Sequence, residues 1–280
     1  MEEIFSKINI IKDLQLIIYN YLSPAHKYVL DIRNNMYCED ILAKYDPYLM
    51  CYCIKKGVIA EVYMMIKIYA KYGRFKNMIW LYNKNLVSKH WYVDEVTFAY
   101  AAEYGDLKIL KWLLKKNFKH DYLTFAYAAK NGNLDNMRWL LKNNFKHDAY
   151  TFSCAALSGN LDTMKWLLEN DFNHDSRTFA RAAENGNLRN MKWLLENNFD
   201  HDPQTFAYAA KNGNLNNMKW LLENNFEHDY RTFNYAIVNG NLDNLKWLLE
   251  NNFIHEKYVI EYSNIDIDPN IKKWLIENDF

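Results

Sequence analysis

The stretch from Asp121 to Phe145 reads DYLTFAYAAKNGNLDNMRWLLKNNF, and close copies of it follow one another along most of the 280-residue chain. Its Thr-Phe pair recurs every 27 residues, and a Trp stands fifteen residues after each Thr. The Thr positions are Thr97, Thr124, Thr151, Thr178, Thr205 and Thr232, and the Trp series continues to Trp274. A fixed period of this length is typical of one supersecondary unit that is copied and stacked, so the sequence predicts a solenoid.

Each copy carries the start and stop signals of a first helix. Asp121 suits the N-cap, because its carboxylate can accept hydrogen bonds from the free N–H groups of the first turn. The equivalent Asp202 is followed by Pro203, which is favoured at the first helical position. Gly132 is expected to end the helix in the left-handed conformation. A first helix is therefore predicted over about residues 122–131.

A second helix is predicted to begin near Leu134. The spacing of Leu134, Met137 and Leu141 predicts one buried stripe. Trp139 lies off that stripe, and one Trp at a constant position in every unit is interpreted as core between units. A platform on which nucleic-acid bases stack is the alternative interpretation. Asn144 is predicted to be the left-handed residue that follows the helix.

The unit resembles an ankyrin repeat, over about residues 61–280. Ala128-Ala129 and Gly132 are similar to the Ala-Ala and Gly of the ankyrin helical turn. The second helix matches through Leu134, Met137, Leu140 and Leu141. The unit is about six residues shorter than the ankyrin period, and the missing residues fall where ankyrin units project a β-hairpin. The resemblance implies an all-α, ankyrin-like solenoid of stacked helix pairs without long β-hairpin fingers.

The organisation of the chain follows from where this pattern begins and fades. Residues 1–60 do not fit the repeat and are expected to form a helical N-terminal region, residues 61–96 a degenerate first repeat, residues 97–258 six regular repeats, and residues 259–280 a C-terminal capping repeat. The segment Ile11–Pro24 resembles the opening helix of an F-box, which would recruit a Skp-type adaptor of a ubiquitin ligase. The alternative is that the N-terminal helices only cap the solenoid.

Composition restricts the class of function. The 34 basic and 34 acidic residues balance, which argues against bulk nucleic-acid binding. No apolar run is long enough for a membrane helix, and the acidic N-terminus does not resemble a signal peptide. The four cysteines do not follow the repeat, so a reducing, cytoplasmic location is expected. Short arrays rich in Asn and Tyr resemble those of large DNA viruses of protists, which would place the protein in a host cell.

Two features could carry chemistry. A His precedes an acidic residue at His120, His147, His174, His201, His228 and His255, a pairing that suits base or metal chemistry. Equivalent side chains in stacked units lie roughly 10 Å apart, too far to share a metal, so packing beside the Asp cap is the preferred interpretation. Cys51-x-Cys53 lacks a matching pair at zinc-finger spacing. We therefore expect no catalytic residues, metal or cofactor.

Binding of a protein partner is predicted at positions whose residues differ from unit to unit. Positions equivalent to 123, 127 and 130 share one face of the first helix and vary between units, while the packing positions do not. The residues predicted to bind a protein partner there are Tyr127, Arg177, Arg181, Tyr208, Arg231 and Tyr235. The alternative interpretation is that these positions vary because they only face solvent. The ends of the second helices also change from basic to acidic along the chain, which can orient a charged partner.

Overall fold

The computed structural model describes residues 62–83, 95–254 and 267–278. The chain divides into two compact units, which span Met1–Val93 and Asp94–Phe280. The F-box-like segment, Cys51-x-Cys53 and His255 lie outside the described residues. The domain boundaries expected from the sequence stay a prediction.

Described residues of the first unit form one helix pair, α5 (Val62–Lys71) and α6 (Phe75–Asn83). In the second unit, a ten-residue first helix alternates with a nine-residue second helix. The first helices are α7 (Glu95–Tyr104), α9 (Tyr122–Asn131), α11 (Ala149–Ser158), α13 (Ser176–Asn185), α15 (Pro203–Asn212) and α17 (Tyr230–Asn239). The second helices are α8 (Leu107–Lys115), α10 (Leu134–Lys142), α12 (Leu161–Glu169), α14 (Leu188–Glu196), α16 (Leu215–Glu223) and α18 (Leu242–Glu250), and α20 (Pro269–Glu277) follows them.

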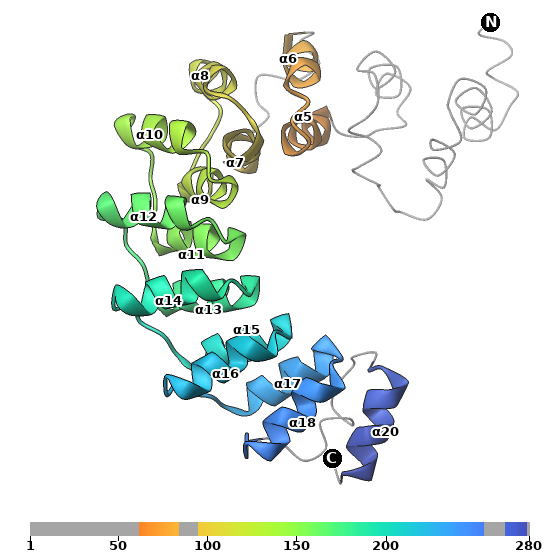
Figure 1. Cartoon of the computed structure of the whole chain (residues 1–280). Coiled ribbons are helices and arrows are strands. Elements are labelled where there is room, and N and C mark those ends of the chain that lie inside the picture. The colour runs from red at the N-terminus through yellow and green to blue at the C-terminus, as the bar shows by residue number, and fades with distance from the viewer. Residues whose placement is uncertain (1–61, 84–94, 255–266, 279–280) are drawn as a thin grey trace, which may run out of the picture. The chain divides into compact units, whose positions relative to one another are not determined.

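The helix pairs of the second unit are stacked in chain order (Figure 1). Each first helix from α7 to α17 packs against the next first helix, and each second helix packs on the first helix of its own pair. The described residues contain no strand, and a short turn joins each pair to the next. This confirms the prediction of an all-helical solenoid without β-hairpin fingers.

The helix boundaries follow the predicted capping signals. The carboxylate of Asp121 accepts a hydrogen bond from the N–H of Leu123 at 2.9 Å, and Gly132 is left-handed with φ 72°. Asn144 is left-handed with φ 55°, and the N–H of Phe145 donates to the carbonyl of Leu140 at 3.1 Å. The same left-handed position is filled in the other units by Asn117, Asp171, Asn198, Asn225 and Asn252.

The buried stripe of the second helix differs from the predicted one. Met137 and Leu140 are fully buried, but Leu134 and Leu141 are only half-buried. Asn136 takes a buried position, because its Nδ2 group donates to the carbonyl of Gly105 in the preceding unit at 2.9 Å. A polar side chain can be buried when such a partner is present. The helix is therefore turned toward the glycine turn of its neighbour.

The Trp series is not the core between units. Trp139 is half-buried, and its ring centroid lies 5.5 Å from that of Phe145 at the end of the same helix. The core between units is formed instead by the first-helix Phe residues, which are fully buried. Phe125, for example, lies 5.0 Å from Phe172 and 5.5 Å from the ring of His147. The interpretation of the Trp residues as buried core was wrong, because their rings pack on the end of their own helix.

Candidate interaction surface

The variable positions of the first helices form a surface that we call the first-helix face. It contains the positions equivalent to 123, 127 and 130 in the six units from α7 to α17. Aromatic rings from neighbouring units meet on it. Tyr208 and Tyr235 stack with centroids 5.6 Å apart and an angle of 19° between the ring planes. Tyr127 pairs with Tyr100 at 5.5 Å. Two predicted binding residues, Tyr208 and Tyr235, therefore lie together, and Tyr127 belongs to a second pair.

A cationic cluster surrounds Tyr208. The guanidinium carbon of Arg181 lies 5.3 Å from the centroid of the Tyr208 ring, and Lys211 Nζ lies 5.5 Å from it. Both cations also pair with Glu184, where Lys211 Nζ is 2.7 Å from Oε1. Burial alone would raise the pKa of Glu184, but hydrogen bonds from Lys211 and Arg181 lower it below its ordinary value. The carboxylate therefore stays ionised and holds both cations at the tyrosine.

A similar arrangement recurs three units earlier. Lys130 Nζ lies 3.0 Å from an oxygen of Glu103 and 5.6 Å from the ring centroid of Tyr127. Burial would lower the pKa of Lys130, but the hydrogen bond with Glu103 raises it. The side chain of Glu103 is only 5% exposed, so this ion pair compensates for part of the water that its carboxylate loses on burial. The sequence placed these two charged residues on the same face but did not lead us to predict that they pair. The pairing could have been found from residues of opposite charge at equivalent positions, 27 residues apart, in neighbouring units.

The third of the six units has no tyrosine at the position equivalent to Tyr127. Cys154 stands where the neighbouring units have Tyr or Arg, and it is buried. Burial raises the pKa of the Cys154 thiol, which keeps it protonated and poorly nucleophilic. The pKa of Tyr150 is raised to about 12. The largest cause is its electrostatic interaction with the Cys154 side chain, and the second is burial. This part of the first-helix face therefore presents neutral groups.

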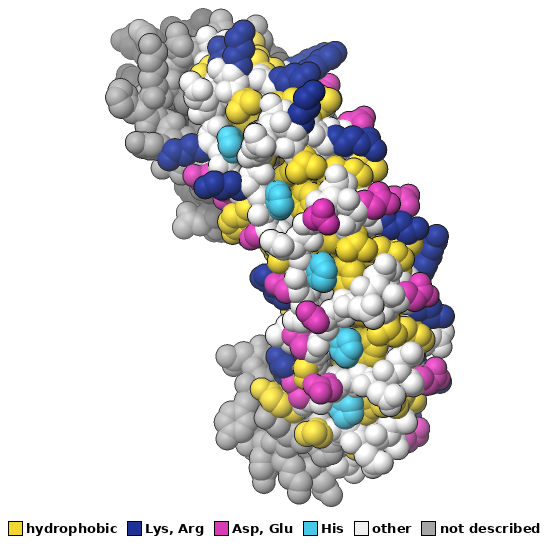
Figure 2. Space-filling model, turned by 90° about the vertical axis from the view of Figure 1, so that its left-hand side faces the viewer, with side chains coloured by type: hydrophobic (Ala, Val, Ile, Leu, Met, Phe, Trp, Pro, Cys, Tyr) yellow, Lys and Arg dark blue, Asp and Glu magenta, His cyan; other side chains and the backbone are white. Residues whose placement is uncertain are grey.

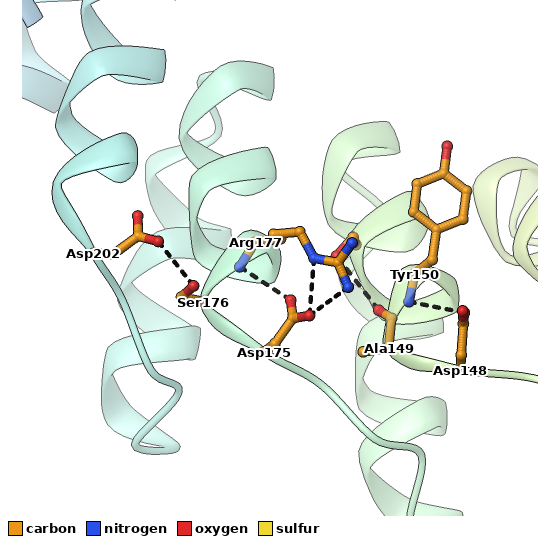
Figure 3. Close-up of polar contacts among 8 residues, drawn as sticks. Asp148, Ala149, Tyr150, Asp175, Ser176, Arg177 and Asp202 are labelled. Atoms are coloured by element: carbon orange, nitrogen blue, oxygen red, sulfur yellow. Dashed lines mark hydrogen bonds and ion pairs between the residues drawn. The ribbon is translucent and has the colours of Figure 1, made fainter. Parts of the chain in front are cut away.

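Two predicted binding residues, Arg177 and Arg231, are held by the caps of their own helices. Arg177 Nε donates to Asp175 at 2.8 Å, and Figure 3 shows its guanidinium turned back onto that carboxylate. Arg231 Nε donates to Asp229 at the same distance. Among the described residues, no hydrogen bond or ring contact joins either arginine to Arg181 or Tyr208. Both remain partly accessible, with 57% and 37% of their side chains exposed.

The histidine series packs between aromatic rings. His174 stacks on Phe199 with centroids 4.0 Å apart, and it meets the edge of Phe152 at 5.7 Å. Figure 2 shows the histidines as a column along one face of the stack. This confirms that the histidines pack beside the caps. Among the described residues, no group of three His, Cys, Asp or Glu side chains could hold a metal ion.

Stability is expected to fall as the pH is lowered from 7.5 to 5. Burial lowers the pKa of His147 and His228 from 6.5, against the opposing charges of Asp148 and Asp229. The unfolded chain therefore binds protons more readily below pH 6.5, and the stability present above that pH is lost as the pH falls through the folded-state pKa.

Urea unfolding at several pH values measures this dependence. The double variant His147→Phe, His228→Phe keeps aromatic rings at both sites and removes two titrating groups. Its stability should change less between pH 7.5 and 5 than that of the wild type. An equal pH dependence in the two proteins would show that these rings do not titrate with unfolding.

The chain is similar to known repeat proteins. A family model described as ankyrin repeats (3 copies) matches residues 98–178 and again residues 179–259. No curated protein matches the chain. Among solved structures, the chain is similar to the pentatricopeptide repeat protein PPR10 in complex with an 18-nt psaJ RNA element, at 11% identity and a TM-score of 0.34. A cysteine-to-serine variant of that complex gives the same values, and the alignment covers 96% of this chain but only 52% of the PPR10 chain.

Proposed function

Because the chain belongs to the ankyrin-repeat family, we propose that it is a non-catalytic scaffold that binds a partner protein through the first-helix face. Ankyrin repeats typically mediate protein–protein interactions. The observation that carries the choice of surface is the cluster of Arg181, Tyr208 and Tyr235, which joins three consecutive units. No described helix is long and apolar enough to cross a membrane.

The physical basis for binding is that these side chains are ordered before a partner arrives. Glu184 holds Arg181, and Tyr208 is fixed between Arg181 and the ring of Tyr235. Arg and Tyr are frequent anchors of interfaces, and side chains that are already ordered lose less entropy on binding. Because the charges near Tyr208 are paired, we propose that a partner contacts aromatic and guanidinium surfaces more than net charge.

Replacing Arg181 and Tyr208 together by Ala is expected to weaken partner binding at least tenfold, or about 1.4 kcal/mol. The partner would first be identified by affinity purification of the full chain from its native cell. Its affinity for purified wild type and variant would then be measured by calorimetry. Both replaced residues are partly exposed, so the helical circular dichroism should be unchanged.

The matched control replaces Arg189 and Tyr122 by Ala. These are also one Arg and one Tyr, and both are exposed outside the first-helix face. The control should bind as the wild type does. Equal binding by the Arg181/Tyr208 variant and the wild type would rule out this surface.

The sequence of residues 11–24 favours a second candidate function, a substrate adaptor of a cullin ubiquitin ligase. In this case Ile11–Pro24 would bind a Skp-type adaptor while the solenoid binds the substrate. A pull-down with a purified Skp-type adaptor, using the chain with and without residues 1–45, tests it. Retention only by the longer chain supports this function. A viral origin, with location in the cytoplasm of a host cell, also stays a proposal.

A further inference from the structure

The C-terminal ends of the second helices form a charged border that we call the second-helix edge. Its basic part, at the ends of α8 and α10, contains Lys115, Lys116, Lys119, Lys142 and Lys146. Its acidic part, at the ends of α12 to α18, contains Glu169, Asp171, Glu196, Asp200, Glu223, Glu227 and Glu250. All twelve residues are exposed, and all lie in the same compact unit. In Figure 2, basic side chains crowd the upper end of the view and acidic ones become more frequent below.

Helix stability does not explain the acidic part. Glu169, Glu196, Glu223 and Glu250 are the last residues of their helices, where the partial negative charge of the helix end disfavours a carboxylate. A Lys stands four residues before each Glu, and this order of the pair is the less stabilising one. Within the described part of the chain, no ion pair involves a carboxylate of the acidic part. The same helix position holds Lys in α8 and α10, which the helix end favours.

We infer that two copies of the chain associate in antiparallel orientation along the second-helix edge. The two-fold axis passes between the ends of α10 and α12, where the sign of the charge changes. The end of α10, with Lys142 and Lys146, then faces the end of α12, with Glu169 and Asp171. The end of α8 faces that of α14. A two-fold axis forms every such contact twice, so complementary halves on one edge suffice for a closed dimer.

The register follows from the order of the charges. Moving the axis by one unit, to lie between α12 and α14, would bring Glu169 opposite Glu196. Like charges in contact disfavour that arrangement. In the inferred register the overlap of charged ends runs from α8 to α14, and the ends of α16 and α18 face no Lys of the basic part. Half-exposed Trp139 and Trp166 stand one turn before the edge and add apolar area beside the charges. The association uses no residue of the first-helix face, so it is independent of the proposed function.

The first test is the mass of the full chain in solution at about 100 μM, measured by light scattering during gel filtration. At 50 mM NaCl we expect twice the chain mass of 33.6 kDa, and at 500 mM NaCl the mass of one chain. Salt should have this effect because the screening length falls from more than about 10 Å to about 4 Å. A single chain at 50 mM NaCl, or a dimer that 500 mM NaCl leaves unchanged, would overturn the inference.

A matched pair of variants tests the register. Glu169→Lys with Glu196→Lys reverses charges inside the overlap and should weaken self-association at least tenfold. Glu223→Lys with Glu250→Lys makes the same changes at the same helix position outside the overlap, and should weaken it less than about threefold. Sedimentation at several concentrations gives both constants. An equal weakening in the two variants would exclude this register.

Mixing two charge-reversed variants shows whether the loss of self-association comes from the charges or from unfolding. Lys115→Glu with Lys142→Glu places Glu at the last position of all four overlapping helices, α8 to α14, so this variant should run as a single chain. The Glu169→Lys, Glu196→Lys variant should do the same for the opposite reason. Mixed in equal amounts at 50 mM NaCl, the two should form a heterodimer, because every facing pair then has opposite sign. If both variants show wild-type circular dichroism and the mixture stays monomeric, the inference fails.

Discussion

Replacing Phe152 by Ala is expected to lower the free energy of unfolding by about 3–5 kcal/mol. Phe152 is fully buried in α11, and its ring lies 5.1 Å from Phe199 and 5.7 Å from His174. Its removal opens a cavity between units, which rigid helices on both sides cannot fill. Urea unfolding followed by circular dichroism measures the change.

The control for this substitution is Trp166→Ala in the same unit. Trp166 is larger than Phe152, but it is half-buried and contacts Phe172 at the end of its own helix. Its loss should cost about 1–2 kcal/mol, as for a partly exposed side chain. A larger cost for Trp166→Ala than for Phe152→Ala would mean that the Trp series holds the units together after all.

Replacing Gly186 by Ala is expected to cost about 2–3 kcal/mol, against about 1–2 kcal/mol for Gly240→Ala. Both glycines are left-handed, with φ 82° and 77°, so the backbone strain is similar. A Cβ at Gly186 would lie 2.5 Å from Asn212 Oδ1, whereas nothing lies within 4 Å at Gly240.

The extra cost at Gly186 comes from a hydrogen bond between units. Asn212 Nδ2 donates to the carbonyl of Glu184 at 3.2 Å, and the new methyl group would displace this side chain. Thermal unfolding of the two single variants measures the difference. Equal costs would show that Asn212 moves aside without loss.

The helix boundaries could be predicted from the sequence because their causes are local. Asp121, Gly132 and Asn144 act on groups within a few residues of themselves, so one unit contains the whole signal. The rotation of the second helix could not be predicted in this way. It depends on Asn136 reaching a carbonyl 31 residues earlier, and the sequence of one unit does not show which neighbouring carbonyl is free.

The sequence pointed to one helix face as the candidate site, but it could not predict the contacts of the residues there. The variation of positions such as Tyr208 and Arg181 indicated which helix face to consider. Whether an arginine reaches a neighbouring ring or its own cap depends on distances set by stacking. Arg181 lies over Tyr208, while Arg177 turns to Asp175. Both carry the same charge in the same helix, so composition could not separate them.

The pairing of each unit with its neighbour also determines how the chain can fold. Hydrogen bonds between units join residues 26 to 34 positions apart, as from Ser176 to Asp202 and from Asn136 to Ala102. The contacting Phe152 and Phe199 are 47 positions apart. A chain with such short loops to close has a low contact order, which favours rapid folding. Folding of this solenoid can therefore start at any pair of adjacent units and spread in both directions.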